Sequence, residues 1–298
     1  MVNLQTGGYI METQTQTITE PVLDMGERGT PTEHMEAYQF TVREEELTTP
    51  SGLIVPGKRA IVREDTEEVI GTVGSHYKVL THAEALDPII RNLESRGLKT
   101  FKRVNLVDGG AKMFANIYFP GEEFEVGDHS NDSVWPGVSV VNSLDGSLKY
   151  RPEATIYRLA CTNGMRIPMK MAGFSAIHSK NQDFESIVEK ILASISEGSH
   201  FHTFHRMANI GRPADTIELQ IDQILEDKKS TFPRRYKDLV MAEIAKNTNI
   251  RFNTITVWDI YNAFQSVIEH HMIREKGKVI RGRALEEDLF KYFSTVAS

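Results

Sequence analysis

Hydrophobic and polar residues alternate over the middle of the chain, and a period of two residues predicts β-strands. The runs are short, and each is bounded by glycine, proline or acidic residues, as strands usually are. They lie at 59–63, 69–73, 99–107, 111–119, 137–144, 147–150 and 154–162. The number of runs and their spacing predict an antiparallel sheet.

The segments between these runs predict how the strands connect. Asp108-Gly109-Gly110 and Asp145-Gly146 each separate two runs. Glycine tolerates the positive φ of tight turns, so both predict hairpins. The acidic turn Glu64–Glu67 predicts another hairpin, and the acidic segment 121–132 is expected to be a long exposed loop.

One helix is expected before the longer strands. Thr81 and Glu84 have the spacing of a capping box, and Gly97 stands where a helix C-cap belongs. Pro88 is too deep for the first turn of a helix that begins at Thr81. The helix therefore either runs through Pro88 or restarts there, with Asp87 as its N-cap.

After Asn181 the hydrophobic period changes to 3.6 residues, which predicts helices. The helical stripes lie at 184–195, 217–225 (with Asp215 as N-cap), 236–244, 254–274 and 284–296. We therefore predict an α+β fold: a mainly antiparallel β-sheet with one early helix, followed by a helical C-terminal part. The expected parts are a flexible acidic N-terminal arm (1–57), a sheet-rich core (58–180) and a helical region (181–298), with regular structure beginning near Lys58.

Composition excludes several classes of protein. The chain has 298 residues, of which 40% are hydrophobic and 25% charged, and a single cysteine. One cysteine excludes an internal disulfide and a cysteine-rich zinc module. No run of about 18 apolar residues predicts a membrane span, and no secretory signal is evident. We expect a cytoplasmic protein that does not contact a membrane.

Charge is unevenly distributed, although the net charge is −7. Residues 1–68 carry 5 bases and 13 acids, and residues 121–147 carry 6 acids and no base. By contrast, residues 69–120 carry 7 bases and 4 acids, and residues 148–180 carry 6 bases and 1 acid. This is either ordinary mixing of surface charge or one basic face built from the two basic segments.

Aromatic residues alternate with basic ones on one side of the predicted 99–119 hairpin. Cations bind phosphates and aromatic rings stack on splayed bases, so this pattern is typical of a surface for single-stranded nucleic acid. Alternatively, Phe114 and Tyr118 pack under a covering helix, with the lysines at its rim. The candidate nucleic-acid-binding residues are Lys99, Phe101, Lys102, Arg103, Lys112, Phe114, Tyr118, Lys149 and Arg151. For Arg158, in the predicted 154–162 strand, a structural role in an ion pair with Asp145 or Glu153 is at least as expected as a role in ligand binding.

Motifs for catalysis or cofactor binding are missing from the sequence. Two histidine groups, His200/His202/His205 and His270/His271, could bind zinc, but no carboxylate signature accompanies them. Cys161 falls in a predicted strand, where a buried apolar role is the common one. Asp128 and Asp132 lie in the predicted acidic loop, where solvated carboxylates are usual. We expect no enzyme activity, no cofactor and no metal.

Two stretches resemble an uncharacterised phage/plasmid-like protein family. They are Asn142-Ser143-Leu144-Asp145-Gly146-Ser147, followed by Arg158–Gly164 and His178, and Thr256–Phe264 followed by His270. The likeness spans roughly residues 70–275. It implies that the chain belongs to a bacteriophage, prophage or conjugative plasmid. The order of elements is also loosely similar to the cores of single-strand annealing recombination proteins, which is an analogy of fold alone.

The leading hypothesis is a protein of phage or plasmid DNA metabolism that binds, and possibly anneals, single-stranded DNA. The alternative is a non-enzymatic interaction protein that acts on a host or phage protein through the acidic segments 1–68 and 121–132. A metal-dependent enzyme that uses the histidines is a third. The N-terminal arm and the long helix around Trp258 also suggest a homo-oligomer.

Overall fold

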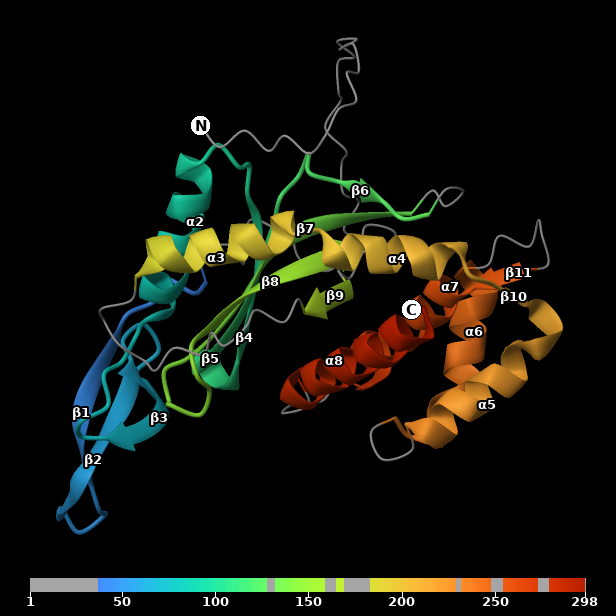
Figure 1. Ribbon diagram of the computed structural model, residues 1–298. Coiled ribbons are helices and arrows are strands. Elements are labelled where there is room, and N and C mark those ends of the chain that lie inside the picture. The colour runs from blue at the N-terminus through green and yellow to red at the C-terminus, as the bar shows by residue number, and fades with distance from the viewer. Residues whose placement is uncertain are drawn as a thin grey trace.

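A computed structural model describes residues 37–127, 132–158, 165–168, 183–228, 232–247, 254–272 and 279–297. Antiparallel sheets with one early helix come first, and a helical region follows (Figure 1). The predicted α+β class is therefore confirmed.

The main sheet is antiparallel, with strand order β4-β5-β7-β8-β9. Its members are β4 (Phe101–Val107), β5 (Lys112–Tyr118), β7 (Ser133–Ser143), β8 (Arg151–Arg158) and β9 (Met165–Pro168). A two-residue strand, β6 (Phe124–Glu125), pairs with the first residues of β7. The acidic segment that the sequence predicts as an exposed loop is therefore partly ordered against the sheet. Its residues Val126 and Asp132 are buried, at 2% and 8% exposure.

Both glycine-containing turns connect antiparallel strands, as predicted. Between β4 and β5 lies the short turn η1 (Asp108–Gly110), in which Gly109 and Gly110 have φ values of 66° and 97°. The connection from β7 to β8 is longer than predicted, and residues 147–149 are not in a strand. There the Asp145 carboxylate accepts hydrogen bonds from the Ser147 N–H and hydroxyl at 2.9 and 2.6 Å. These polar groups of the loop are thus hydrogen-bonded without strand pairing.

A second, three-stranded antiparallel sheet is formed by β1 (Val42–Thr48), β2 (Ile54–Arg63) and β3 (Glu68–Gly74). The predicted hairpin around the acidic turn is confirmed as β2–β3. Among the described residues, the first of which is residue 37, β1 begins at Val42, so the prediction that regular structure starts near Lys58 was wrong. Strand β1 is rich in charged residues, and the start of β2 is exposed. Neither segment therefore shows the alternation of apolar and polar residues that indicates a half-buried strand.

The early helix is α2 (His82–Ser95), and it is continuous. Thr81 and Glu84 form the predicted capping box, and Gly97 follows the helix with φ 86°. The helix does not restart at Asp87, and Pro88 lies inside it. Proline removes one helical N–H, but the Pro88 carbonyl still accepts a bond from the Asn92 side chain at 2.9 Å.

The C-terminal region contains α3 (Phe184–Ser196), α4 (Ser199–Asn209), α5 (Ile217–Asp227), α6 (Lys237–Asn247), α7 (Val257–Val267) and α8 (Val279–Val296). Smaller elements connect them: β10 (Gly211–Pro213), η2 (Ala214–Thr216), η3 (Arg234–Tyr236), β11 (Thr254–Thr256) and the π-helical turn η5 (Ile268–Met272). Four predicted stripes are helices, and the 254–274 stripe begins as strand β11. Helix α4 was not predicted, and Thr216, not Asp215, is the N-cap of α5.

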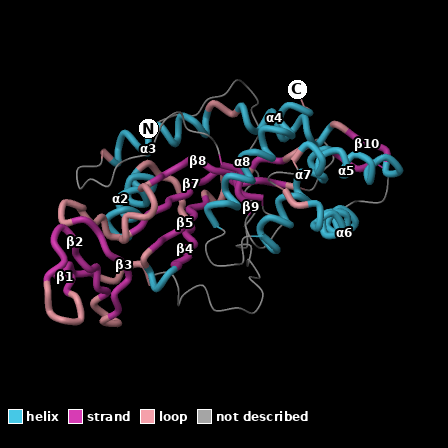
Figure 2. The backbone as a smooth tube through the Cα atoms, turned by 90° about the horizontal axis from the view of Figure 1, so that it is seen from below, coloured by secondary structure: helices cyan, strands magenta, loops and turns pink. Residues whose placement is uncertain are grey.

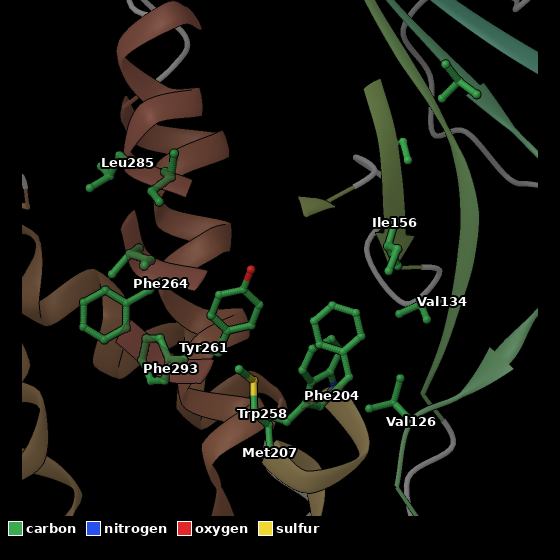
Figure 3. Close-up of a cluster of buried hydrophobic side chains, with 14 of the residues drawn as sticks. Val126, Val134, Ile156, Phe204, Met207, Trp258, Tyr261, Phe264, Leu285 and Phe293 are labelled. Carbon is green, nitrogen blue, oxygen red and sulfur yellow. The ribbon is translucent and has the colours of Figure 1, made fainter. Parts of the chain in front are cut away.

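Helices and sheet contribute side chains to one hydrophobic core. Figures 1 and 2 show the backbone arrangement of the two regions from two directions. Figure 3 shows Val134 and Ile156 from the sheet, and Val126 just after β6, facing Phe204 and Trp258 from the helices. Trp258 is 1% exposed, and its indole N–H donates to the Asp132 carboxylate at 2.7 Å. The Trp258 side chain is therefore part of the hydrophobic core. Across the described residues, no helix has the length and apolar character to span a membrane.

Candidate nucleic-acid interface

The two faces of the main sheet have different surroundings. On the first face, Met113, Ala115 and Ile117 of β5 are fully buried in the core, and α2 and α3 contact the sheet there. Strand alternation directs Phe114, Asn116 and Tyr118 to the opposite side, which we call the second face. In β4, Phe101, Arg103 and Asn105 pair with these three residues, so the predicted grouping on one face is confirmed.

Four aromatic rings from four neighbouring strands pack together on the second face. Tyr118 lies with its ring centroid 6.0 Å from Phe101, 6.4 Å from Trp135 and 4.2 Å from Tyr157. Gly137 allows this packing, because a Cβ there would lie 2.6 Å from the Tyr157 ring and 2.1 Å from the Ile117 carbonyl oxygen. We call Phe101, Tyr118, Trp135 and Tyr157 the aromatic cluster.

Most of these rings are buried. Tyr118, Trp135 and Tyr157 are 8%, 7% and 1% exposed, and Phe114 is 4% exposed. Phe114 and Tyr118 therefore present almost no surface to a base in this conformation. Phe101 is half-buried and lies on β4, the last strand at one edge of the sheet. It is the member of the cluster that a base could reach.

Two buried polar atoms on the second face have no hydrogen-bond partner: the Trp135 indole nitrogen and the side-chain oxygen of Asn116, Oδ1. Leaving such a group unsatisfied costs about 1–3 kcal/mol. Asn116 lies between Arg103 on β4 and Ser139 on β7 in the pairing register. The second face thus contains both a donor and an acceptor that a ligand could use.

Three of the predicted cations have no side-chain partner among the described residues. Lys99 and Lys149 are exposed, and Arg103 is half-buried. Lys99 and Arg103 lie beside Phe101 at one end of the hairpin. Lys149 lies beyond the other end, where Val141 and Arg151 are paired, about 20 Å away along the strands. The structure brings two of the three together.

The remaining predicted cations are already engaged. Lys102 opposes Ile117 and so lies on the first face, where its ammonium group donates to the Tyr38 hydroxyl at 2.7 Å. Lys112 lies 2.6 Å from Asp108 and 3.9 Å from Asp145. Arg151 lies 2.5 Å from Glu153 and 3.9 Å from Glu287. Among the described residues, these three side chains are therefore paired within the fold.

The Asn142–Ser147 signature joins the two sheets. A Cβ on Gly71 of β3 would lie 2.5 Å from the Asp145 Cβ, so only glycine fits there without a shift. The Tyr77 hydroxyl donates to the Ser143 carbonyl at 3.2 Å. Burial is the main reason that the pKa of Tyr77 rises to about 12, and the nearby Asp145 carboxylate adds to it. The signature thus has a clear architectural role. Residues 159–164 and His178, which complete it, lie outside the described residues, and so do Cys161 and Asp128.

His82 and Asn142 form a buried polar pair at this junction. His82 Nε2 lies 2.7 Å from the Gly110 carbonyl oxygen, which can only accept, so Nε2 carries the proton. Nδ1 is then the acceptor for the Asn142 amide at 3.0 Å, and the same amide donates to the Leu80 carbonyl at 2.9 Å. Burial lowers the pKa of His82 to about 4, so the ring is neutral.

The histidine groups do not form a metal site in the part of the chain that the structure describes. His202 and His205 are exposed on α4, and the side chain of His200 lies outside the described residues. In η5, His270 is half-buried and His271 is exposed. Asp132 is a partner of Trp258 rather than a solvated loop residue.

Two members of the aromatic cluster, Trp135 and Tyr157, were not among the predicted binding residues. Trp135 precedes the predicted 137–144 strand, and Tyr157 lies in the predicted 154–162 strand, outside the 99–119 hairpin that carried the pattern. Their direct pairing across β7 and β8 places both rings on the second face. The alternation within each strand could have found them, provided that the strand register was known.

Comparison with known proteins places the chain in a family. No curated protein and no solved structure matches it. The family described as "Domain of unknown function (DUF932)" matches residues 69–287, which include β3, the whole main sheet and most of the helical region. Both stretches that carried the sequence resemblance fall within this range. The chain therefore belongs to the DUF932 family.

Proposed function

We propose that this protein binds single-stranded DNA along the β4 edge of the second face. The observation that carries the proposal is the position of Phe101, a half-exposed ring between two unpartnered cations, Lys99 and Arg103. Cations bind phosphates, and an aromatic ring stacks on a base with about 1–3 kcal/mol per base. Phe101 would stack the base, and the rest of the aromatic cluster would support its ring.

The unpartnered polar atoms of the second face favour the same surface. A strand lying over β4 and β5 would offer base and sugar groups to the Trp135 indole N–H and the Asn116 oxygen. Both atoms are buried now, so their use requires the strand to displace what covers them. Lys149 would meet the backbone of a longer DNA at the far end of the hairpin.

The proposed process is the metabolism of phage or plasmid DNA, including the annealing of complementary strands. This part rests on the sequence resemblance to phage and plasmid proteins. The chemistry involves phosphate pairing and base stacking only, with no covalent step, metal or cofactor. The acidic N-terminal arm and the glutamates around β6 (Glu122, Glu123 and Glu125) would repel DNA and so favour its binding at the β4 edge.

The first test is the binding of a labelled oligonucleotide as a function of salt. Three phosphate contacts predict a slope of about −2 for log K against log salt on single strands. Lys99→Glu with Arg103→Glu should weaken binding at least about tenfold at low salt and flatten the slope. Arg91→Glu is the matched control, because Arg91 is exposed on α2, over the first face. No binding at low salt, or a slope near zero, would exclude the proposal.

Annealing can be tested separately with two complementary strands that carry a fluorophore and a quencher. Wild-type protein should speed their pairing, and the Lys99/Arg103 variant should not. Lys102 and Lys112 are unsuitable for this test, because both are engaged within the fold.

The alternative, an interaction protein acting on a host or phage protein, is favoured by one observation. Glu122, Glu123 and Glu125 form an exposed acidic strip beside Phe124. A chain that binds no oligonucleotide but retains a protein from host extract, and loses it on Glu→Lys substitution in this strip, would support this function instead.

A further inference from the structure

We propose that the tip of the β1–β2 hairpin docks on the strip around Phe124 of a second copy of this chain. The tip consists of Thr49–Lys58, and the strip consists of Glu122–Glu125. This proposal does not depend on DNA binding, because neither surface contains Lys99, Phe101 or Arg103.

The hairpin tip is apolar and basic. Leu53 and Ile54 are 67% and 59% exposed, which is unusual for large apolar side chains placed side by side. Residues 47–60 contain no acid and two bases, Lys58 and Arg59. Arg59 pairs with Glu44 at 2.8 Å, whereas Lys58 is exposed and has no partner among the described residues.

The Phe124 strip has the complementary character. Phe124 is 40% exposed and stacks on Phe201 of α4, with ring centroids 3.8 Å apart and an angle of 19°. Glu122, Glu123 and Glu125 around it are exposed and have no ion pair in the described structure. A flat aromatic surface ringed by acids suits a partner that is apolar with basic flanks.

The two surfaces cannot meet within one chain. Strip residue Phe124 pairs with Val134, at the start of β7. The sheet that carries the hairpin packs at Asp145, just beyond the end of β7. The tip and the strip thus lie at opposite ends of an 11-residue strand, and Figure 1 shows β6 far from the β1–β2 tip. Contact therefore requires a second copy, joined head to tail, which closes into a ring or grows as a filament.

Light scattering tests the assembly. Wild-type protein should have a mass of at least two chains of 33.7 kDa, about 67 kDa. Leu53→Asp with Ile54→Asp should reduce it to a single chain, and Phe124→Asp should do the same. Leu219→Asp is the matched control, because Leu219 is 74% exposed on α5, and it should keep the wild-type mass. Circular dichroism should show that all variants are folded.

Mixing the two defective variants tests the head-to-tail geometry. The tip variant retains an intact strip, and the Phe124 variant retains an intact tip, so the mixture should form a dimer of about 67 kDa. If the contact joined identical surfaces, one of the two variants would remain associated by itself, which would overturn the proposal, and so would a mixture that stays monomeric. A monomeric wild-type protein would overturn it as well.

Charge reversal provides a second test that mild changes in folding would not mimic. Lys58→Glu and Glu125→Lys should each weaken association about tenfold, and the two together in one chain should recover part of it. Equal or greater loss in the double variant would contradict the proposed pairing of basic tip and acidic strip.

Discussion

The two faces of the main sheet differ in the side chains they carry. On the first face, α2 and α3 contact the sheet, and side chains of β5 such as Met113 and Ile117 are fully buried. On the second face lie the aromatic cluster and Arg103. Both faces contain buried polar atoms without a partner: Asn142 Oδ1 on the first, and the Trp135 indole nitrogen and Asn116 Oδ1 on the second. The faces thus differ in aromatic and charged side chains, and not in how completely their polar groups are hydrogen-bonded.

The difference indicates which side of the sheet is available for function. Stability on the first face comes from burial of β5 and β7 side chains under helices. The second face combines an aromatic cluster, unpartnered polar atoms and two cations at an open edge. Substitutions on the two faces should therefore affect different measurements.

The largest expected effect is on the first face. Ile117→Ala removes a fully buried side chain and should lower the free energy of unfolding by about 4 kcal/mol. Phe101→Ala, at the edge of the second face, should cost less than about 1 kcal/mol but weaken oligonucleotide binding about tenfold. Chemical denaturation and oligonucleotide titration of both variants provide the comparison. Similar losses of stability would remove the proposed distinction.

The buried histidine predicts a dependence of stability on pH. The pKa of His82 is about 4 when folded and about 6.5 when unfolded, so the unfolded chain binds more protons between these values. The contribution of His82 to the free energy of unfolding is complete above pH 6.5, and it falls by about 3 kcal/mol as the pH drops to 4. Protonation of Nδ1 also breaks the bond from Asn142. Denaturation of wild type and His82→Gln at pH 7 and pH 5 should show a shallower dependence in the variant.

The close packing of the aromatic cluster predicts a cost for a single methyl group. Gly137→Ala should lower the free energy of unfolding by about 2 kcal/mol, since the new Cβ meets the Ile117 carbonyl and the Tyr157 ring. Gly74→Ala is the control, because nothing lies within 4 Å of a Cβ there and its φ is not positive. Thermal denaturation of both variants checks this. Equal losses of stability in the two variants would show that the effect comes from replacing a glycine in a strand, and not from the contacts around Gly137.

The smallest effect should have the opposite sign. Asn116→Leu removes a buried acceptor without a partner and should stabilise the protein by up to about 1 kcal/mol while weakening oligonucleotide binding. Asn142→Leu, on the first face, should destabilise it, because the Asn142 amide donates twice. If Asn116→Leu were destabilising as well, the oxygen would have a structural partner and the proposed ligand role would fail.

Local sequence patterns predicted much of the fold. The hairpin glycines, the Thr81–Glu84 capping box and most of the helical stripes act over a few residues, so their signals are present in the sequence itself. The missed elements lack such a signal. Strand β1 has charged residues on an exposed edge, and β6 has two residues only.

The grouping of Phe101, Arg103 and Tyr118 was predictable, because a tight turn fixes the register of one hairpin. The sequence determined by itself which side chains alternate within each strand and where the chain turns. Only the tertiary structure decided which of them meet across strands, which are buried and which cations are already paired. Strand pairing brought Trp135 and Tyr157 into the aromatic cluster. Lys102, Lys112 and Arg151, which were among the predicted binding residues, are paired instead with Tyr38, Asp108 and Glu153. Asp108 and Glu153 lie only four and two residues from their cations, so the local sequence could have indicated these two pairs. Strand pairing and the contact of Lys102 with Tyr38 join segments distant in sequence, and no local pattern of residues encodes them.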